Sequence, residues 1–98
     1  MLLRSFKELG DRDRERDAYA SLGIAFEHLG DFKQSIGYQL KDLAIVKDIA
    51  NKSGEGVAYI NLGNAFCGLG EFKKAMHFHK LGLEVSKEMR SRAGEGAA

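Results

Sequence analysis

The sequence has 98 residues, enough for one domain at most, and its 15 basic and 14 acidic residues leave a net charge of +1. This balance excludes the bulk positive field that gathers nucleic acid or an anionic membrane, and no apolar run approaches the roughly 20 residues of a membrane span. The opening MLLRSF is too short in leucines for a signal peptide, and the single cysteine, Cys67, cannot form an internal disulfide. A reducing, cytoplasmic location is therefore expected.

The chain repeats itself with a period of 40 residues. The segment AYASLGIAFEHLGDFK begins at Ala18, and AYINLGNAFCGLGEFK begins at Ala58. The same register pairs the GEG at 54–56 with the GEG at 94–96. A fixed period between about 20 and 50 residues indicates a stacked array. We therefore predict the end of one unit (1–10), two full units (11–50 and 51–90) and the start of a further unit (91–98).

Each unit is predicted to form two helices. In the first unit an apolar stripe with the three-and-four spacing of a helix face is followed by Gly30, a residue suited to ending a helix. Asp31 can then cap the second helix, with Gln34 three residues on. The second unit repeats this plan. The first stripe is Tyr19, Leu22, Phe26 and Leu29; the second helices carry Phe32, Ile36, Leu40, Leu43, Val46 and Ile49, and Phe72, Met76, Leu83 and Val85.

Two glycines lie inside the first helices, at Gly23 and Gly63. Glycine within a helix costs about 1 kcal/mol relative to alanine. Its presence at the same place in both units predicts a close helix crossing, with Ser35 and Ala75 as the small residues that receive it. The alternative is that both glycines are simply tolerated.

These residues resemble the tetratricopeptide repeat. The resemblance rests on an aromatic residue, a Leu-Gly pair, a second aromatic residue, a Gly-Asp-aromatic turn and a small residue opening the second helix. The period of 40 exceeds the usual value of about 34, and the usual closing proline is absent. The longer period and the residue pattern of the repeats are similar to those of Pins/LGN-type G-protein-signalling modulators. The matching residues are Tyr19, Leu22, Gly23, Phe26, Gly30, Asp31, Phe32 and Ser35, and Tyr59, Leu62, Gly63, Phe66, Gly70, Glu71, Phe72 and Ala75.

The resemblance implies an all-α fold in which antiparallel helix hairpins stack into an α-solenoid, with the first helices lining a concave groove for a partner peptide. The apolar Ile24 and Ile60 lie on the side of the first helices opposite the core stripe, and the alternative is that they pack between adjacent units. Asn64 there can hydrogen-bond a peptide backbone. The predicted groove residues are Ile24, Glu27, His28, Ile60, Asn61, Asn64 and Cys67.

Other candidate sites were weighed against this groove. His77 and His79 are two residues apart, so on a helix they point in nearly opposite directions and cannot hold one metal ion. The run DRDRERD at 11–17 is expected to be solvated, with opposite charges at i,i+3 spacing, or else to present charge to a peptide. No nucleophile and base converge, so no enzyme, cofactor or metal site is expected.

The predicted function is a non-catalytic adaptor that binds a peptide segment of a partner protein, with G-protein signalling or cell polarity as the setting that the narrower likeness implies. The alternatives are a structural spacer and a regulatory segment of a larger protein whose catalytic domain lies elsewhere. Because repeat arrays depend on neighbour contacts, and two units are near the usual minimum, the end faces are expected to favour self-association.

Overall fold

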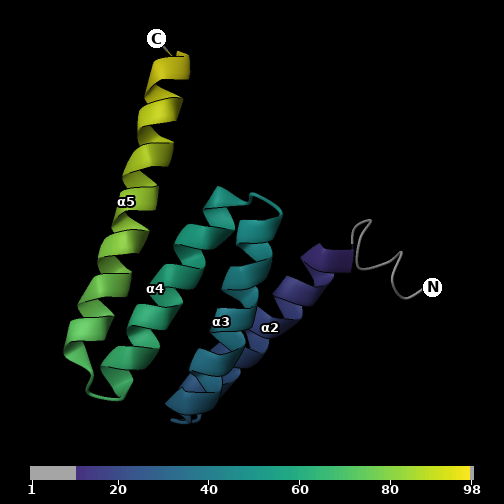
Figure 1. Ribbon diagram of the computed structural model, residues 1–98, viewed down its shortest axis with the longest axis vertical. Helices are drawn as coiled ribbons and strands as arrows, with labels where there is room; N and C mark the ends of the chain where they lie inside the picture. Colours follow the sequence, from purple (N-terminus) through teal and green to yellow (C-terminus); the bar gives the residue numbers. More distant parts are fainter. Residues whose placement is uncertain (1–10, 98) are drawn as a thin grey trace.

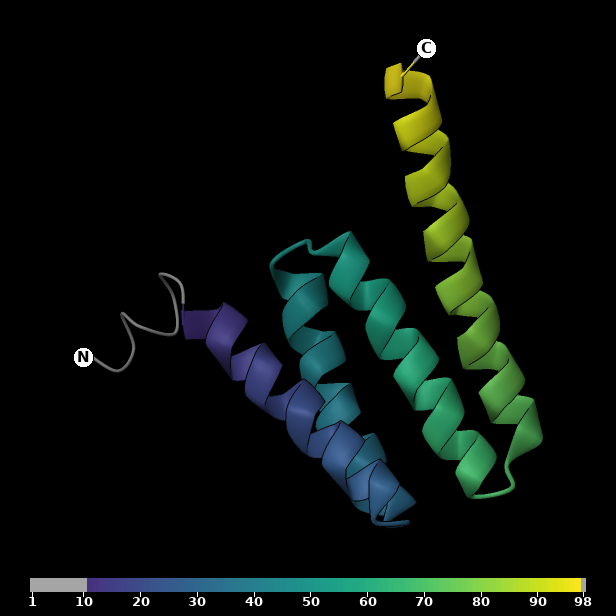
Figure 2. The same ribbon diagram turned by 180° about the vertical axis from the view of Figure 1, so that it is seen from behind.

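The computed structural model describes residues 11–97, and side chains over residues 12–91. The predicted partial unit at 1–10 therefore lies outside the described residues. The described part consists of the helices α2 (Asp11–His28), α3 (Phe32–Asp48), α4 (Lys52–Gly68) and α5 (Phe72–Ala97), without a strand. Consecutive helices run antiparallel and side by side (Figures 1 and 2), and α2 also touches α4. This confirms the predicted all-α fold of stacked helix hairpins.

The turns between helices use the local chemistry expected of them. Gly30 and Gly70 adopt φ values of 83° and 81°, the left-handed conformation that glycine reaches without steric cost. The Asp31 side chain accepts a hydrogen bond from the Gln34 backbone N–H at 3.3 Å, as the capping pattern predicts. At the junction of the two units, Asn51 caps α4 in the same way by accepting from the Gly54 N–H at 2.9 Å. The turn residues thus set where each helix begins.

A stack of three aromatic rings holds each hairpin together. In the first hairpin the Tyr38 ring of α3 lies 6.1 Å from Tyr19 and 5.6 Å from Phe26, both on α2. The second hairpin repeats this arrangement 40 residues later, with Phe78 6.2 Å from Tyr59 and 5.4 Å from Phe66. Since stacked rings add about 0.5–1.5 kcal/mol per pair beyond the area they bury, this stack is a principal contact within each repeat.

A second core joins one hairpin to the next. Leu43 and Val46 of α3 pack with Ala58 and Leu62 of α4, and Leu62 is fully buried. Val46 lies so close to Gly54 that a side chain there would approach Val46 Cγ1 to 2.7 Å. The α3–α4 contact is therefore closely packed at this point.

The same stripe is buried to different degrees in the two repeats. Leu62 is 0% exposed, whereas its counterpart Leu22 is 41% exposed; Leu43 is 8% exposed, whereas Leu83 is 53% exposed. The exposed copies lie on the outermost described helices, α2 and α5, whose outer sides face no other described helix. Several predicted core positions are exposed for this reason, and Leu40, on the outer side of α3, is exposed as well. The exposed members are Leu22, Leu29, Leu40, Ile49, Phe72, Met76 and Leu83.

The charged run at 11–17 differs from its prediction. Instead of pairing at i,i+3 within α2, Arg12 reaches Asp48 at 2.9 Å, and Arg16 Nε donates to the buried Asp42 at 3.0 Å. Arg16 also lies 3.4 Å from its neighbour Asp17. The ion pairs of Arg12 and Arg16 join α2 to α3, whereas Asp13, Arg14 and Asp17 of the same run are exposed to solvent.

The two repeats use different chemistry at the place where Arg16 meets Asp42. The counterparts of these residues are Gly56 and Gly82, and a Cβ on Gly82 would lie 3.3 Å from the Gly56 carbonyl oxygen. A close backbone approach in the second repeat thus replaces an ion pair in the first. Asp42 therefore stands at the position that the small Gly82 occupies in the second repeat.

Helix α5 continues to Ala97, whereas its counterpart α3 ends at Asp48. The first repeat turns at Ala50, whose φ of 56° is strained for a residue with a side chain. Packing of α4 against α3 offsets that strain. No described helix packs on α5 in the same way, and the helix runs straight on. The start of a further unit at 91–98 stays a prediction.

We expect the Arg16→Ala variant to be less stable than the wild type by about 2–3 kcal/mol, because it leaves the buried Asp42 carboxylate without its cation. The Arg16→Ala/Asp42→Ala variant is expected to recover most of this loss. Urea denaturation of both variants and of Asp42→Ala measures the coupling. A double variant as unstable as Arg16→Ala alone would contradict the proposed coupling between Arg16 and Asp42.

The loss in Arg16→Ala should also depend on pH. Burial raises the pKa of Asp42, while the hydrogen bond from Arg16 opposes that rise. Without Arg16 the pKa of Asp42 rises further, so the folded state binds more protons than the unfolded state above about pH 4. Stability then falls as the pH rises through that window. The deficit relative to the wild type should be larger at about pH 7 than at about pH 4, and equal deficits would contradict this.

Candidate functional site

The predicted groove residues lie on the first helices of the two hairpins, α2 and α4, which contact one another directly. We call this surface the first-helix face. Ile24 and His28 of α2 are exposed, as are Ile60, Asn64 and Cys67 of α4, whereas Glu27 and Asn61 are half-buried. The first-helix face comprises Ile24, Glu27, His28, Ile60, Asn61, Asn64 and Cys67.

Ile24 of the first hairpin and Ile60 of the second hairpin are both exposed. Ile60 also contacts the second helix of its own hairpin, because a Cβ on Gly82 would lie 2.9 Å from Ile60 Cγ1. It remains 42% exposed despite this contact, and Ile24 is 41% exposed. Among the described residues, the neighbours of Ile24 and Ile60 therefore leave both side chains exposed.

The sequence reasoning missed His79 as a member of this surface and considered it only as a metal ligand. His79 reaches from α5 across α4, and its Nε2 lies 3.0 Å from Asn64 Oδ1. The amide oxygen accepts, so this hydrogen bond places the ring proton on Nε2. The contact holds the Asn64 side chain through its oxygen, and the Nδ2–H₂ group of the amide can still donate. Gly63 is the sequence signal that could have revealed it.

Gly63 allows His79 to lie across α4, because a Cβ at this position would overlap the imidazole ring. Gly23 does the same for Gln39, whose Nε2 would lie 2.5 Å from the added Cβ. The predicted close crossing is therefore present, but the residues that occupy it are Gln39 and His79 rather than Ser35 and Ala75. Both glycines make room for a long polar side chain of the second helix.

Gln39 and His79 occupy matching positions in different surroundings. Gln39 is fully buried, and neither atom of its amide has a hydrogen-bond partner among the described residues. His79 is exposed. The described helices cover α3 on both sides but cover α5 on only one side. The position shared by Gln39 and His79 is therefore solvent-accessible only in the second hairpin.

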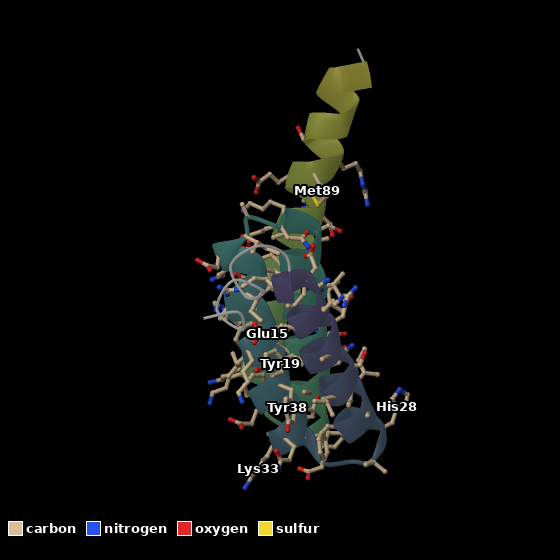
Figure 3. All side chains as sticks on the ribbon, turned by 90° about the vertical axis from the view of Figure 1, so that its right-hand side faces the viewer. Glu15, Tyr19, His28, Lys33, Tyr38 and Met89 are labelled. Carbon is tan, nitrogen blue, oxygen red and sulfur yellow. The ribbon has the colours of Figure 1, made fainter. Side chains whose placement is uncertain are left out.

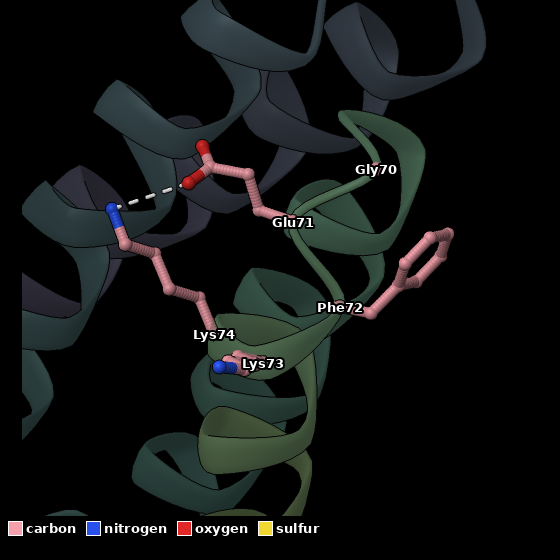
Figure 4. A pocket seen from close by; sticks show the side chains of 5 residues that line it. All are labelled: Gly70, Glu71, Phe72, Lys73 and Lys74. Atoms are coloured by element: carbon pink, nitrogen blue, oxygen red, sulfur yellow. Dashed lines mark ion pairs between the residues drawn. The ribbon is translucent and has the colours of Figure 1, made fainter.

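Two hollows in the described surface lie away from the first-helix face. One, of about 120 Å³, is lined by Gln34, Gly37, Tyr38 and Lys41 of α3. The other, of about 560 Å³, lies at the turn between α4 and α5. Figure 4 shows the Phe72 ring pointing away from the ion pair between Glu71 and Lys74, whose charged atoms are 3.4 Å apart. The lining of the larger hollow is Gly70, Glu71, Phe72, Lys73 and Lys74.

Seen from the side of α2, the molecule presents Tyr19 and Tyr38 near the middle of the first hairpin and His28 at its lower end, where the His28 side chain points outward (Figure 3). His28 is exposed and is the last residue of α2. It lies about one helical turn beyond Ile24, at the end of the first-helix face. The polar centre of this face is Asn64.

Residues 18–53 match the family model described as Tetratricopeptide repeat. The match spans most of the first hairpin and the turn into α4. This segment is therefore similar to a tetratricopeptide repeat, a motif that generally serves protein–protein interaction. No curated protein matches the chain. Among the described residues, no helix combines the length and apolar character needed to cross a membrane.

Alanine at the two crossing glycines should have opposite consequences. Gly23→Ala forces the fully buried Gln39 to move and is expected to cost about 1–3 kcal/mol. Gly63→Ala displaces only the exposed His79, so it should be neutral or stabilise the helix by up to about 1 kcal/mol. Thermal and urea denaturation of both variants check this expectation, and equal losses would contradict it.

Proposed function

We propose that the first-helix face binds a peptide segment of a partner protein, and that the chain acts as a non-catalytic adaptor. The observation that carries the proposal is a pair of exposed isoleucines, Ile24 and Ile60, beside an asparagine held by His79. Such a surface offers apolar contact area together with a directed hydrogen-bond donor. Recognition sites for peptides commonly combine these two features.

Each element of the face has a separate part in this binding. Ile24 and Ile60 supply contact for apolar side chains of the peptide; burying the exposed part of one isoleucine is worth about 1 kcal/mol. Asn64 donates from its amide nitrogen to a backbone carbonyl, which gives affinity without dependence on peptide sequence. Glu27 and His28 add polar groups at one end of the face, and Asn61 and Cys67 complete its surface on α4.

The narrower setting is also part of the proposal. The long repeat period and the likeness to Pins/LGN-type modulators favour a cytoplasmic scaffold in G-protein signalling or cell polarity. A second candidate is a structural spacer or regulatory segment of a larger protein, favoured by the partial packing of Ile60 against Gly82. Binding by the isolated chain distinguishes the adaptor from the spacer.

A random-peptide display selection against the full chain tests the proposal. We expect enriched peptides whose affinity falls about fivefold in the Asn64→Ala variant and further in Ile24→Glu/Asn64→Ala, since each change removes roughly 1 kcal/mol of contact. Fluorescence anisotropy with the enriched peptides measures these affinities.

Leu40→Glu is the matched control, because Leu40 is an exposed apolar residue on the outer side of α3 whose counterpart in the second repeat is Lys80. It should fold and bind as the wild type does. If peptides bind the Ile24→Glu/Asn64→Ala variant with unchanged affinity, and circular dichroism shows that this variant is folded, the first-helix face is not the binding surface.

A further inference from the structure

Helix α5 carries a row of large apolar side chains that no described residue covers. Phe72 and Met76 are 62% and 71% exposed, and Leu83 is more than half exposed. Scattered single apolar residues on a surface are ordinary, but a row along one side of one helix marks a contact surface. We call Phe72, Met76 and Leu83 the α5 end face.

The structure itself shows what covers this kind of face. The counterparts of its three members, 40 residues earlier, are Phe32, Ile36 and Leu43 of α3. Phe32 lies against α4 so closely that a Cβ on Gly68 would overlap its ring, and Leu43 packs with Ala58 and Leu62 of α4. The α5 end face therefore matches the surface that α3 presents to the first helix of the next hairpin.

The complementary half of this contact is exposed on α2. Ala58, Leu62 and Ala65, through which α4 meets its neighbours, are all fully buried. Their counterparts Ala18, Leu22 and Ala25 are exposed. The fourth member, Leu29, corresponds to Leu69 and is more exposed than Leu69. We call Ala18, Leu22, Ala25 and Leu29 the α2 end face.

We propose that α2 of a second copy of this chain packs on the α5 end face in the way that α4 packs on α3. The contact continues an interface already present within the chain and joins two different faces, so it is head-to-tail. Each added copy leaves one free α2 end face and one free α5 end face. Such heterologous contacts build open chains rather than closed dimers.

Three local features determine how well the two copies fit together. The hollow of about 560 Å³ is lined by Phe72, the counterpart of the Phe32 ring that lies against the end of α4. Arg14 stands where α4 has the small Gly54, but α5 has Ser86 where α3 has Val46, which leaves more room. His28 stands where α4 has Gly68, so Phe72 must turn aside. The contact between copies should accordingly be weaker than the α3–α4 contact.

Complementation between two variants of the full chain tests the proposal. Met76→Glu/Leu83→Glu blocks the α5 end face, and Ala18→Glu/Ala25→Glu blocks the α2 end face; all four positions are exposed in a single chain. Each variant alone should self-associate about a hundredfold more weakly than the wild type, because charges replace apolar contacts. Their equimolar mixture should form a one-to-one dimer through the two intact faces, without longer chains.

Sedimentation velocity and equilibrium over a concentration series measure these species, and circular dichroism verifies that each variant is folded. Leu40→Glu, Ile24→Glu and Asn64→Ala should associate as the wild type does, because they lie outside both end faces. His28→Gly should tighten association, since it restores the glycine found in α4.

The proposal is overturned if the wild type stays monomeric up to concentrations on the order of 1 mM. It is also overturned if either blocked variant dimerises alone as well as the wild type does, which would indicate a symmetric contact. A folded, equimolar mixture that remains monomeric would overturn it in the same way.

Discussion

The structure depends on a simple constraint: each helix is wide enough to meet two neighbours, and its hairpin partner covers only one of its sides. The aromatic stack of Tyr19, Phe26 and Tyr38 fills the contact between α2 and its hairpin partner α3. The second side is satisfied where one hairpin meets the next, as Leu43 and Leu62 show by their burial. Where no described helix lies alongside, the same residue types are left in solvent. Stability and exposure are therefore properties of neighbours in the array.

The candidate binding surface arises from the same constraint. Because both sides of α4 are occupied by α3 and α5, its remaining side carries Ile60 and Asn64 outward. A glycine in each first helix then lets the second helix send a polar side chain across it. In the first hairpin that side chain, Gln39, is sealed in; in the second, His79 is exposed and holds Asn64. Two copies of one motif thus give one structural contact and one accessible polar group.

Much of the fold could be predicted from the sequence. The period of 40, the apolar spacing and the glycine turns predicted the helix pairs, and the structure confirms them. The burial of individual residues could not be predicted, because Leu22 and Leu62 have the same local sequence and differ only in their neighbours. The contacts of Arg12 and Arg16 with α3 could not be predicted for a related reason. Spacing along one helix cannot show that Arg16 faces a buried carboxylate on another helix.

The sequence by itself determined the helices, their turns and the repeat, since all three follow from short-range backbone preferences and a periodic pattern. The positions of Ile24, Ile60 and Asn64 opposite the core stripe also followed from helical spacing. Only the tertiary structure decided that Gln39 and His79 fill the glycine crossings, and that an arginine–aspartate pair replaces a glycine pair. The physical reason is that these contacts join residues 16–26 positions apart, whose distance depends on how helices cross.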